Sequence, residues 1–118
     1  MALHTTLPIY KMAYDLLRVV TELVKNMPRD FKQAVGVKIS SESVEIVILV
    51  FRANCARDKT PYLDELLERL EVANLLLRLS FDSRAISTKQ YAKAVEITGS
   101  VGRQAGGWRK KYATSSAG

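Results

Sequence analysis

Hydrophobic residues recur along this chain at spacings of three and four, the period of one face of an α-helix. The first such stripe opens at Leu7-Pro8, because proline is tolerated in a first turn, and it ends at Met27-Pro28. Its predicted inward residues are Tyr10, Tyr14, Leu17, Val20, Val24 and Met27. Charges of alternating sign occupy the opposite side, which we interpret as a solvent-exposed surface. These charged residues are Lys11, Asp15, Arg18, Glu22 and Lys25.

The second helix is predicted from Asp30, a suitable N-cap, to Arg57. Its segment Val44 to Phe51, VEIVILVF, is rich in β-branched residues and by itself is compatible with a buried strand. We interpret the segment as helical because no turn residues separate it from the flanking pattern, and because no second strand is predicted to pair with it. The segment is apolar on nearly all sides, so it must be covered on more than one side.

Two further helices follow, each with a recognisable start signal. Thr60-Pro61 places an N-cap before a proline at the first helical position. A broad apolar stripe comes next, made of Leu63, Leu66, Leu67, Leu70, Ala73 and Leu77 and widened by Val72, Leu75, Leu76 and Leu79. Ser87 and Gln90 form a predicted capping box for the fourth helix, which we expect to run to about Tyr112.

These elements predict an all-α fold, an antiparallel up-down-up-down four-helix bundle. The chain of 118 residues has the length of a single domain, 1–118, and we expect 1–6 and 113–118 to be flexible tails. The apolar faces of the second and third helices are wider than the core of one bundle requires. We therefore expect both faces to be partly buried between subunits of a homo-oligomer.

The segment Val101 to Lys111, VGRQAGGWRKK, combines glycines with a tryptophan inside the fourth helix. Gly102 and Gly106 are four residues apart and so lie on one side of the helix. Each helical glycine costs about 1 kcal/mol relative to alanine, so a compensating contact is expected. We predict that these glycines let a neighbouring helix approach closely, with Trp108 packed beside them; a helix end frayed by glycine is the alternative.

The charge distribution favours an acidic partner such as nucleic acid. The net charge is +6 and the isoelectric point is near 9.6. From Ile97 to the end the chain has cations and no acid. The predicted nucleic-acid-binding residues on and beside the outer side of the fourth helix are Lys89, Lys93, Arg103, Arg109, Lys110 and Lys111. The alternative is a structural or protein-interaction bundle whose positive charge only keeps it soluble.

Few residues of this chain suit catalysis or metal binding. Cys55 is the only cysteine, so no internal disulfide can form, which fits the reducing cytoplasm where we expect the protein to reside. We expect Cys55 to be a small buried apolar residue. The only histidine, His4, precedes the first helix, so no metal site, cofactor or catalytic residue is predicted. No apolar stretch approaches the ~20 residues needed to span a bilayer, and no signal-peptide pattern is present.

Three short segments carry a resemblance to a known family. They are Leu76-Leu77-Arg78-Leu79-Ser80, then Ile86-Ser87-x-x-Gln90-Tyr91, then Val101-Gly102-Arg103-x-x-Gly106-Gly107-Trp108. With these segments the chain resembles the four-helix proteins of the accessory variability determinant type, which are encoded beside reverse transcriptases in diversity-generating retroelements. More distantly, it is similar to the four-helix proteins of ribosomal intervening sequences.

The resemblance implies a homopentameric barrel of bundles with a basic surface and no catalytic activity of its own. It also implies binding to the cognate reverse transcriptase and to template RNA or an RNA–DNA hybrid, in support of mutagenic retrohoming. By match to the family motif, Arg78 and Arg103 are the expected functional cations. Family members often have a further arginine four residues before the position of Arg78. This chain has Asn74 there, so part of the basic surface is missing or supplied elsewhere.

Overall fold

The computed structural model describes residues 6–117, and the expectations for residues 1–5 and 118 lie outside the described residues. Its helices are α1 (Pro8–Lys25), α2 (Arg29–Phe31), α3 (Val37–Cys55), α4 (Thr60–Asp82) and α5 (Thr88–Ala117). A π-helical segment, Lys32–Gly36, joins α2 to α3 without a break, so these segments together form one helix of the bundle. The β-branched segment 44–51 lies inside α3, which confirms its helical interpretation.

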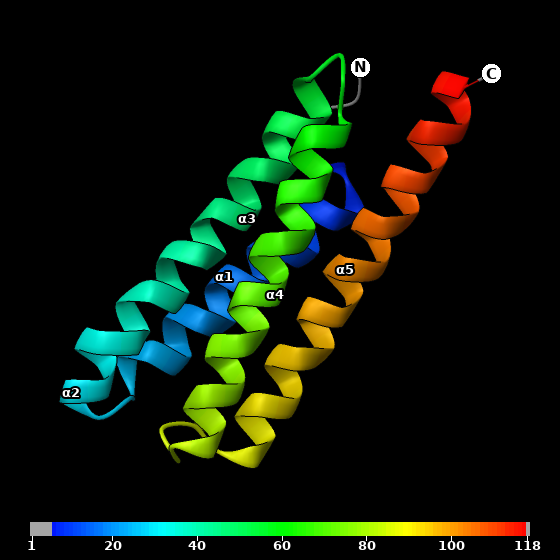
Figure 1. Ribbon diagram of the computed structural model, residues 1–118. Coiled ribbons are helices and arrows are strands. Elements are labelled where there is room, and N and C mark those ends of the chain that lie inside the picture. The colour runs from blue at the N-terminus through cyan, green and yellow to red at the C-terminus, as the bar shows by residue number, and fades with distance from the viewer. Residues whose placement is uncertain (1–5, 118) are drawn as a thin grey trace.

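The long helices form a ring in which each packs against its neighbours in sequence and α1 closes the ring against α5 (Figure 1). Consecutive helices run in opposite directions, with α1 and α4 descending and α3 and α5 ascending in that view. The result is a rod of 50 × 21 × 20 Å. The predicted antiparallel four-helix bundle is thus confirmed for the single chain.

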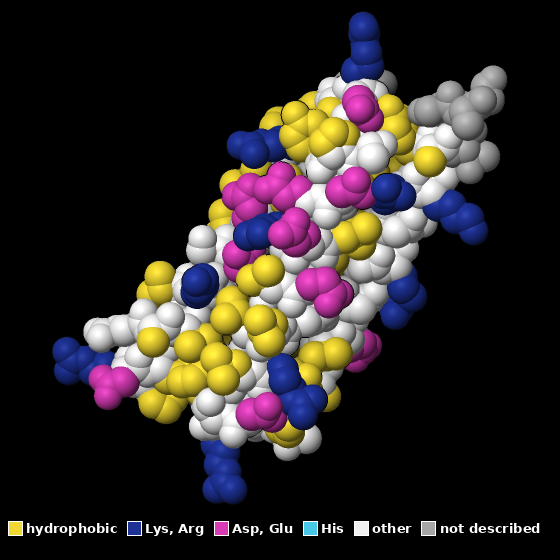
Figure 2. Space-filling model, in the orientation of Figure 1, with side chains coloured by type: hydrophobic (Ala, Val, Ile, Leu, Met, Phe, Trp, Pro, Cys, Tyr) yellow, Lys and Arg dark blue, Asp and Glu magenta, His cyan; other side chains and the backbone are white. Residues whose placement is uncertain are grey.

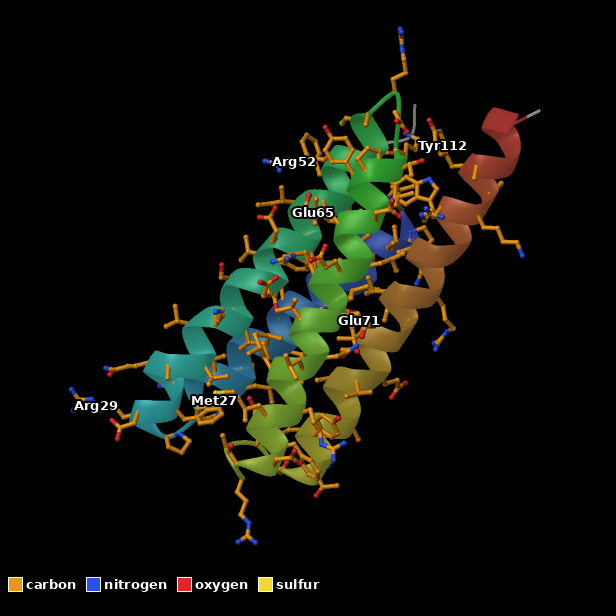
Figure 3. All side chains as sticks on the ribbon, in the orientation of Figure 1. Met27, Arg29, Arg52, Glu65, Glu71 and Tyr112 are labelled. Atoms are coloured by element: carbon orange, nitrogen blue, oxygen red, sulfur yellow. The ribbon has the colours of Figure 1, made fainter. Side chains whose placement is uncertain are left out.

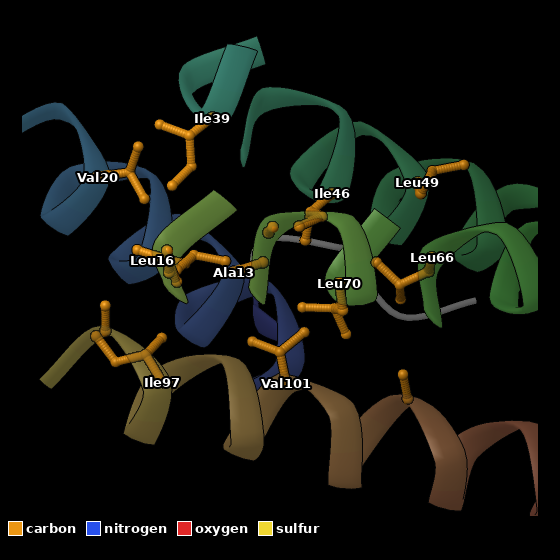
Figure 4. Packing of buried hydrophobic residues seen from close by; sticks show 14 of the residues in the cluster. Ala13, Leu16, Val20, Ile39, Ile46, Leu49, Leu66, Leu70, Ile97 and Val101 are labelled. Atoms are coloured by element: carbon orange, nitrogen blue, oxygen red, sulfur yellow. The ribbon is translucent and has the colours of Figure 1, made fainter. Parts of the chain in front are cut away.

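One continuous apolar core runs through the rod, and every long helix contributes to it (Figure 4). Leu16 of α1, Ile46 of α3, Leu66 of α4 and Val101 of α5 are completely buried there. Each helix buries an apolar stripe in this core, and burial of these stripes provides most of the free energy that holds the helices together.

The buried side of α1 differs from the predicted one. The buried residues are Ile9, Ala13, Leu16, Val20 and Leu23. Two adjacent apolar stripes exist on this helix, and the prediction chose the aromatic one, which is wrong for Tyr14 because its side chain is exposed. The aliphatic stripe is the one buried in the core, because a buried tyrosine hydroxyl would need a hydrogen-bond partner there. Tyr10 and Tyr14 instead stack on each other, with ring centroids 6.5 Å apart.

Two helix starts differ from the predicted N-caps. The second helix of the bundle begins at Arg29 with Pro28 as its N-cap, so Asp30 lies in the first turn, where its charge suits the helix dipole. Thr60 is the first residue of α4 and not its N-cap. Lys59 is the N-cap residue, and the carboxylate of Asp58 accepts a hydrogen bond from the Thr60 backbone N–H at 3.1 Å, which satisfies one of the free N–H groups of the first turn.

The turn between α4 and α5 is held by local hydrogen bonds at both of its ends. The Ser87 N–H donates to Gln90 Oε1 at 2.8 Å and the Gln90 N–H donates to Ser87 Oγ at 3.1 Å, which confirms the capping box. At the end of α4, the Ala85 N–H donates to the Ser80 carbonyl, while Arg84 adopts a left-handed φ of 59°. The sharp reversal therefore places the start of α5 directly beside the end of α4.

The last helix is longer than predicted. Its backbone remains helical to Ala117, so the expectation of a helix end near Tyr112 is wrong. No proline follows Tyr112, and the next glycine is Gly118. The chain therefore lacks a residue that would stop the helix earlier.

Gly36 is the one described glycine whose missing side chain is required by close packing. It ends the π-helical segment, and a Cβ atom there would lie 2.9 Å from Val24 Cγ1 of α1. Phe31, Val35 and Ile39 repeat at intervals of four, which is longer than the α-helical period. The wider π turn keeps these residues on the core side, and it brings the backbone at Gly36 against α1.

The glycines of α5 do not mediate a close helix contact within the chain. A Cβ atom at Gly102 would make only an ordinary contact, 4.0 Å from Leu70 Cδ1. At Gly106 and Gly107 there is open space out to 4 Å. The prediction that Gly106 lets a neighbouring helix of the same bundle approach closely is therefore wrong.

Gly36 and Gly106 should respond in opposite directions to the same substitution. Gly36→Ala should lower the free energy of unfolding by about 1–2 kcal/mol, because overpacking against the stiff Val24 side chain exceeds the gain in helix propensity. Gly106→Ala should raise it by about 0.5–1 kcal/mol through propensity alone. Urea unfolding followed by circular dichroism measures both; a shift of the same sign in the two variants would contradict the packing described here.

Candidate nucleic-acid interface

Helix α5 carries most of the predicted nucleic-acid-binding cations and holds them along one edge of the rod. Its residues Ala94, Val101 and Ala105 are buried against the core, so the opposite side of the helix faces solvent. Four predicted lysines and one arginine are exposed: Lys89, Lys93, Arg103, Lys110 and Lys111. In Figure 2 dark-blue side chains project from the α5 edge of the molecule. The predicted cations are therefore accessible to a large anionic partner.

Lys93 differs from the other cations because it lines a groove between α1 and α5. Asp15 and Glu22 of α1 line the same groove. Arg18 lines the groove as well and pairs with Asp15 at 3.4 Å, so Glu22 is the carboxylate left to offset the positive potential of Lys93.

Arg103 lies at the edge of a second groove, between α4 and α5. A Cβ atom added at Gly99 would lie 3.4 Å from the guanidinium Nη1 of Arg103. The groove is also lined by Glu68 and Glu71 of α4. The absence of a side chain at Gly99 therefore lets the arginine lie along its own helix, near the acidic wall of α4.

Two predicted cations are already engaged by carboxylates. Arg78 Nε donates to both carboxylate oxygens of Asp82, at 3.0 and 3.1 Å, and this hydrogen bond raises the pKa of Arg78. Arg109 pairs with Asp64 across the α4–α5 boundary, and that hydrogen bond raises the pKa of Arg109. Exposed ion pairs of this kind are weak, and a phosphate would have to displace the carboxylate from either arginine in order to bind it.

Asn74, at the position where the family resemblance leads us to expect an arginine, lies between α4 and α5. Its Oδ1 accepts a 2.7 Å hydrogen bond from the hydroxyl of Thr98, which is only 2% exposed. The asparagine therefore satisfies a buried polar group at the helix contact. An arginine side chain at this position would have to turn outward. The Thr98 hydroxyl would then keep only its hydrogen bond to the Val95 carbonyl.

Trp108 contacts Lys59 in the α3–α4 loop. The ammonium group of Lys59 lies 5.9 Å from the Trp108 ring centroid and donates to the carbonyls of Ala53, Asn54 and Ala56. The lysine thus closes the carboxyl end of α3 and joins it to α5. A turn later, the Tyr112 hydroxyl donates to the Arg57 carbonyl at 2.9 Å (Figure 3). These contacts fix the basic end of α5 against the bundle.

Sequence patterns did not identify Lys59 as a structural residue. One signal could have indicated this role. Lys59 directly precedes the helix start at Thr60-Pro61 and follows the end of the preceding helix within a few residues. A lysine in such a short connection can reach the free carbonyls of the helix that has just ended.

Two further findings concern the cysteine and possible metal ligands of residues 6–117. Cys55 is exposed, so the expectation that it is buried is wrong; it is the last residue of α3 and points away from the core. Among residues 6–117 no cluster of three histidine, cysteine or carboxylate side chains could hold a metal ion. Within the same residues, no helix is long and apolar enough to cross a membrane.

Comparison with known proteins identifies the family. A profile described as bAvd-like matches residues 7–112, from the residue before α1 to Tyr112. The chain belongs to the bAvd-like family. The resemblance predicted from its motifs is thereby confirmed. No curated protein and no solved structure matches the chain. The bAvd-like match includes all of the helix-to-helix contacts described above, among them the Lys59 contacts that hold α5.

Removing the ammonium group of Lys59 should loosen the basic end of α5. Lys59→Met keeps the aliphatic chain but loses three charged hydrogen bonds, and should lower the free energy of unfolding by about 1–3 kcal/mol. Lys11→Met, at an exposed position on α1, is the matched control and should change it by less than about 0.5 kcal/mol. Urea unfolding measures both; equal stabilities would show that Lys59 does not close α3.

Proposed function

We propose that this bAvd-like chain is a non-catalytic accessory subunit that acts in the cytoplasm with a retroelement reverse transcriptase. It binds the transcriptase and also template RNA or an RNA–DNA hybrid, and in this way supports mutagenic retrohoming. The observation that carries the proposal is the exposed cationic side of α5 in a member of this family.

The outer half of α5 suits contact with phosphates more than recognition of bases. Arg103, Lys110 and Lys111 are exposed in a region without any acidic residue on the same helix beyond Glu96. Long flexible cations on a helix surface reach backbone phosphates, which position a nucleic acid without reading its sequence. The Lys59 and Tyr112 contacts support this role because they hold the helix that carries these cations rigidly against the bundle.

Self-association through α3 would repeat this cationic surface. Val37, Val44 and Phe51 are exposed and recur every seven residues, so they form one apolar line on the outside of α3. Apolar lines of this kind are typical of subunit contacts. In the proposed homopentamer, five copies of the α5 surface would bind one nucleic acid with the added affinity of multivalent attachment.

Charge reversal on α5 tests nucleic-acid binding. Arg103→Glu with Lys110→Glu should abolish measurable binding to a fluorescently labelled structured RNA while the helical circular dichroism is unchanged. Wild-type affinity should fall steeply between about 50 and 200 mM salt, because each neutralised phosphate releases counterions. The expected sequence preference is small.

A control double variant with the same change in net charge tests whether RNA binding depends on the position of the cations on α5 or only on net charge. Lys11→Glu with Lys38→Glu alters exposed lysines on α1 and α3 and should leave most of the RNA affinity in place. Equal losses in the two double variants would mean that net charge and not α5 governs binding. Absence of RNA binding by the wild type at low salt, with or without the transcriptase, would favour a purely structural bundle.

Assembly can be measured on the purified chain. Light scattering should give a mass of about 66 kDa, five times that of the 13.2 kDa chain. Val44→Glu should reduce this mass, because a charge would be buried in the contact. Val95→Glu, at an exposed position on α5, should not reduce it. A wild-type chain that is monomeric at micromolar concentration would contradict the proposed assembly.

A further inference from the structure

The outer side of α3 carries a regular line of uncharged residues along its whole length. We call it the α3 line; its members, spaced alternately four and three apart and all exposed or half-buried, are Val37, Ser41, Val44, Ile48, Phe51 and Cys55. This alternation is the spacing at which one helix packs lengthwise against another. Within the chain α3 packs against α1 and α4 through its other side, where Ile39 and Ile46 are completely buried. The α3 line is therefore a second packing surface.

The outer side of α4 repeats the same spacing. The α4 line, also exposed or half-buried throughout, consists of Glu65, Glu68, Val72, Leu75 and Leu79. Its second half is apolar, with Leu75 67% exposed and Leu79 44% exposed. Figure 2 shows hydrophobic side chains over the lower part of this face of the molecule and acidic ones above them. Like the α3 line, the apolar half of the α4 line is left open by the packing of the single chain.

The exposed apolar residues of α5 and α1 do not form a comparable line. Val95 of α5 is 37% exposed, but one turn before it Tyr91 stacks on an aromatic ring of α4, and one turn after it is Gly99. On α1 the exposed Tyr14 stacks on its neighbour Tyr10. Single apolar residues are ordinary on a protein surface. We therefore take the lines on α3 and α4 as the surfaces that a partner would cover.

Cations lie beside the α3 line. Lys38 and Arg52 directly follow Val37 and Phe51 in the chain, and both are exposed. Arg52 reaches Glu45 only at 3.9 Å, and 55% of its side chain is accessible to solvent. Positive charge is thus available near both ends of the α3 line.

Carboxylates occupy the first half of the α4 line. Glu68 reaches Arg69 only at 3.6 Å, since that arginine binds Glu42 of α3 at 2.9 Å. Glu65 and its neighbour Glu71, labelled in Figure 3, form no ion pair within the described residues. The charge available beside this half of α4 is therefore negative, and it complements that of α3.

These charges distinguish three ways in which two copies of the chain could pair. If α3 packed on α3, cations would lie beside cations, whichever way the helices ran. If α4 packed on α4, carboxylates would face carboxylates or be buried against leucines. Like charges in a contact cost affinity, and flanking charges select the partner helix. Packing α3 of one copy on α4 of another is the pairing that brings opposite charges together.

The spacings of the two lines also match when the helices run in opposite directions. From Val37 to Phe51 the α3 line advances by four, three, four and three residues, and from Leu79 back to Glu65 the α4 line does the same. In this register the valines of α3 meet the apolar half of α4, and Arg52 lies near the carboxylates. Because α3 and α4 run antiparallel in the bundle (Figure 1), rods placed side by side with parallel axes bring the lines together in this way.

We propose that the chain assembles head to tail, with the α3 line of one copy packed antiparallel on the α4 line of the next. This inference rests on the proposed function, since it assigns the surfaces that build the homo-oligomer. Two different surfaces on each copy make a heterologous contact, which can close into a ring with an odd number of subunits. Helix α5 lies outside the contact, so its cations stay accessible to a nucleic acid.

Light scattering of the full chain tests the surface on α4. Leu75→Glu with Leu79→Glu should reduce the mass to that of one chain, 13.2 kDa, because unpaired carboxylates would be buried against α3. Ala92→Glu with Val95→Glu adds two carboxylates at exposed positions on α5 and should keep the wild-type mass. Unchanged helical circular dichroism of each variant checks that it is folded.

Mixing two defective chains tests the head-to-tail arrangement. The Val44→Glu chain keeps an intact α4 line, and the chain with Leu75→Glu and Leu79→Glu keeps an intact α3 line. Their equimolar mixture should form a species of about 26 kDa, twice the mass of the 13.2 kDa chain, because the two intact lines bind each other. This species should not grow further, since its two remaining lines both carry the added carboxylates.

Each outcome supports or overturns the assignment. A two-chain species in the mixture that neither variant forms alone supports the head-to-tail contact. If the α4 double variant keeps the wild-type mass, or if the mixture remains monomeric, the contact between these lines is wrong while the proposed homo-oligomer stands. If the wild type is itself monomeric at micromolar concentration, the proposed homo-oligomer and this contact are both wrong.

Discussion

Burial of one apolar stripe from each of four helices in a common core is the constraint on which the rest of this structure depends. Leu16, Ile46, Leu66 and Val101 are all completely buried in it (Figure 4). Once these stripes are buried, the rotation of each helix about its axis is fixed. The outward residues of every helix are fixed with it, including those that carry charge. The surface chemistry of the protein is in this sense a consequence of its core.

That surface divides its chemistry among the helices. Helix α5 presents cations such as Arg103 and Lys111, whereas α4 presents Glu71 beside Leu75, and α3 presents an uncharged apolar line. A bundle offers several flat, separate faces on one rigid body, so contacts of different chemistry need not compete. The contact of Lys59 with the end of α3 and with Trp108 joins α5 to the loop between α3 and α4.

Local signals in the sequence determined the elements. Helical spacing of apolar residues, the breaks at prolines and the Ser87–Gln90 capping box depend on neighbours a few residues apart, and they predicted four antiparallel helices correctly. They also indicated the family and the exposed cations Lys89, Arg103 and Lys110. A helix makes its own backbone hydrogen bonds, so its existence can be recognised from local sequence alone.

The tertiary structure alone decided which of two apolar stripes α1 buries, and it showed open space where Gly106 was predicted to contact a helix. It also engaged Arg109 with Asp64, a carboxylate 45 residues away in the chain, and left Cys55 exposed. Spacing within one helix shows which residues share a side, but it does not show what that side faces. What a side faces depends on the rotation of each helix about its own axis relative to its neighbours. That rotation is fixed by packing between residues that are distant in the chain.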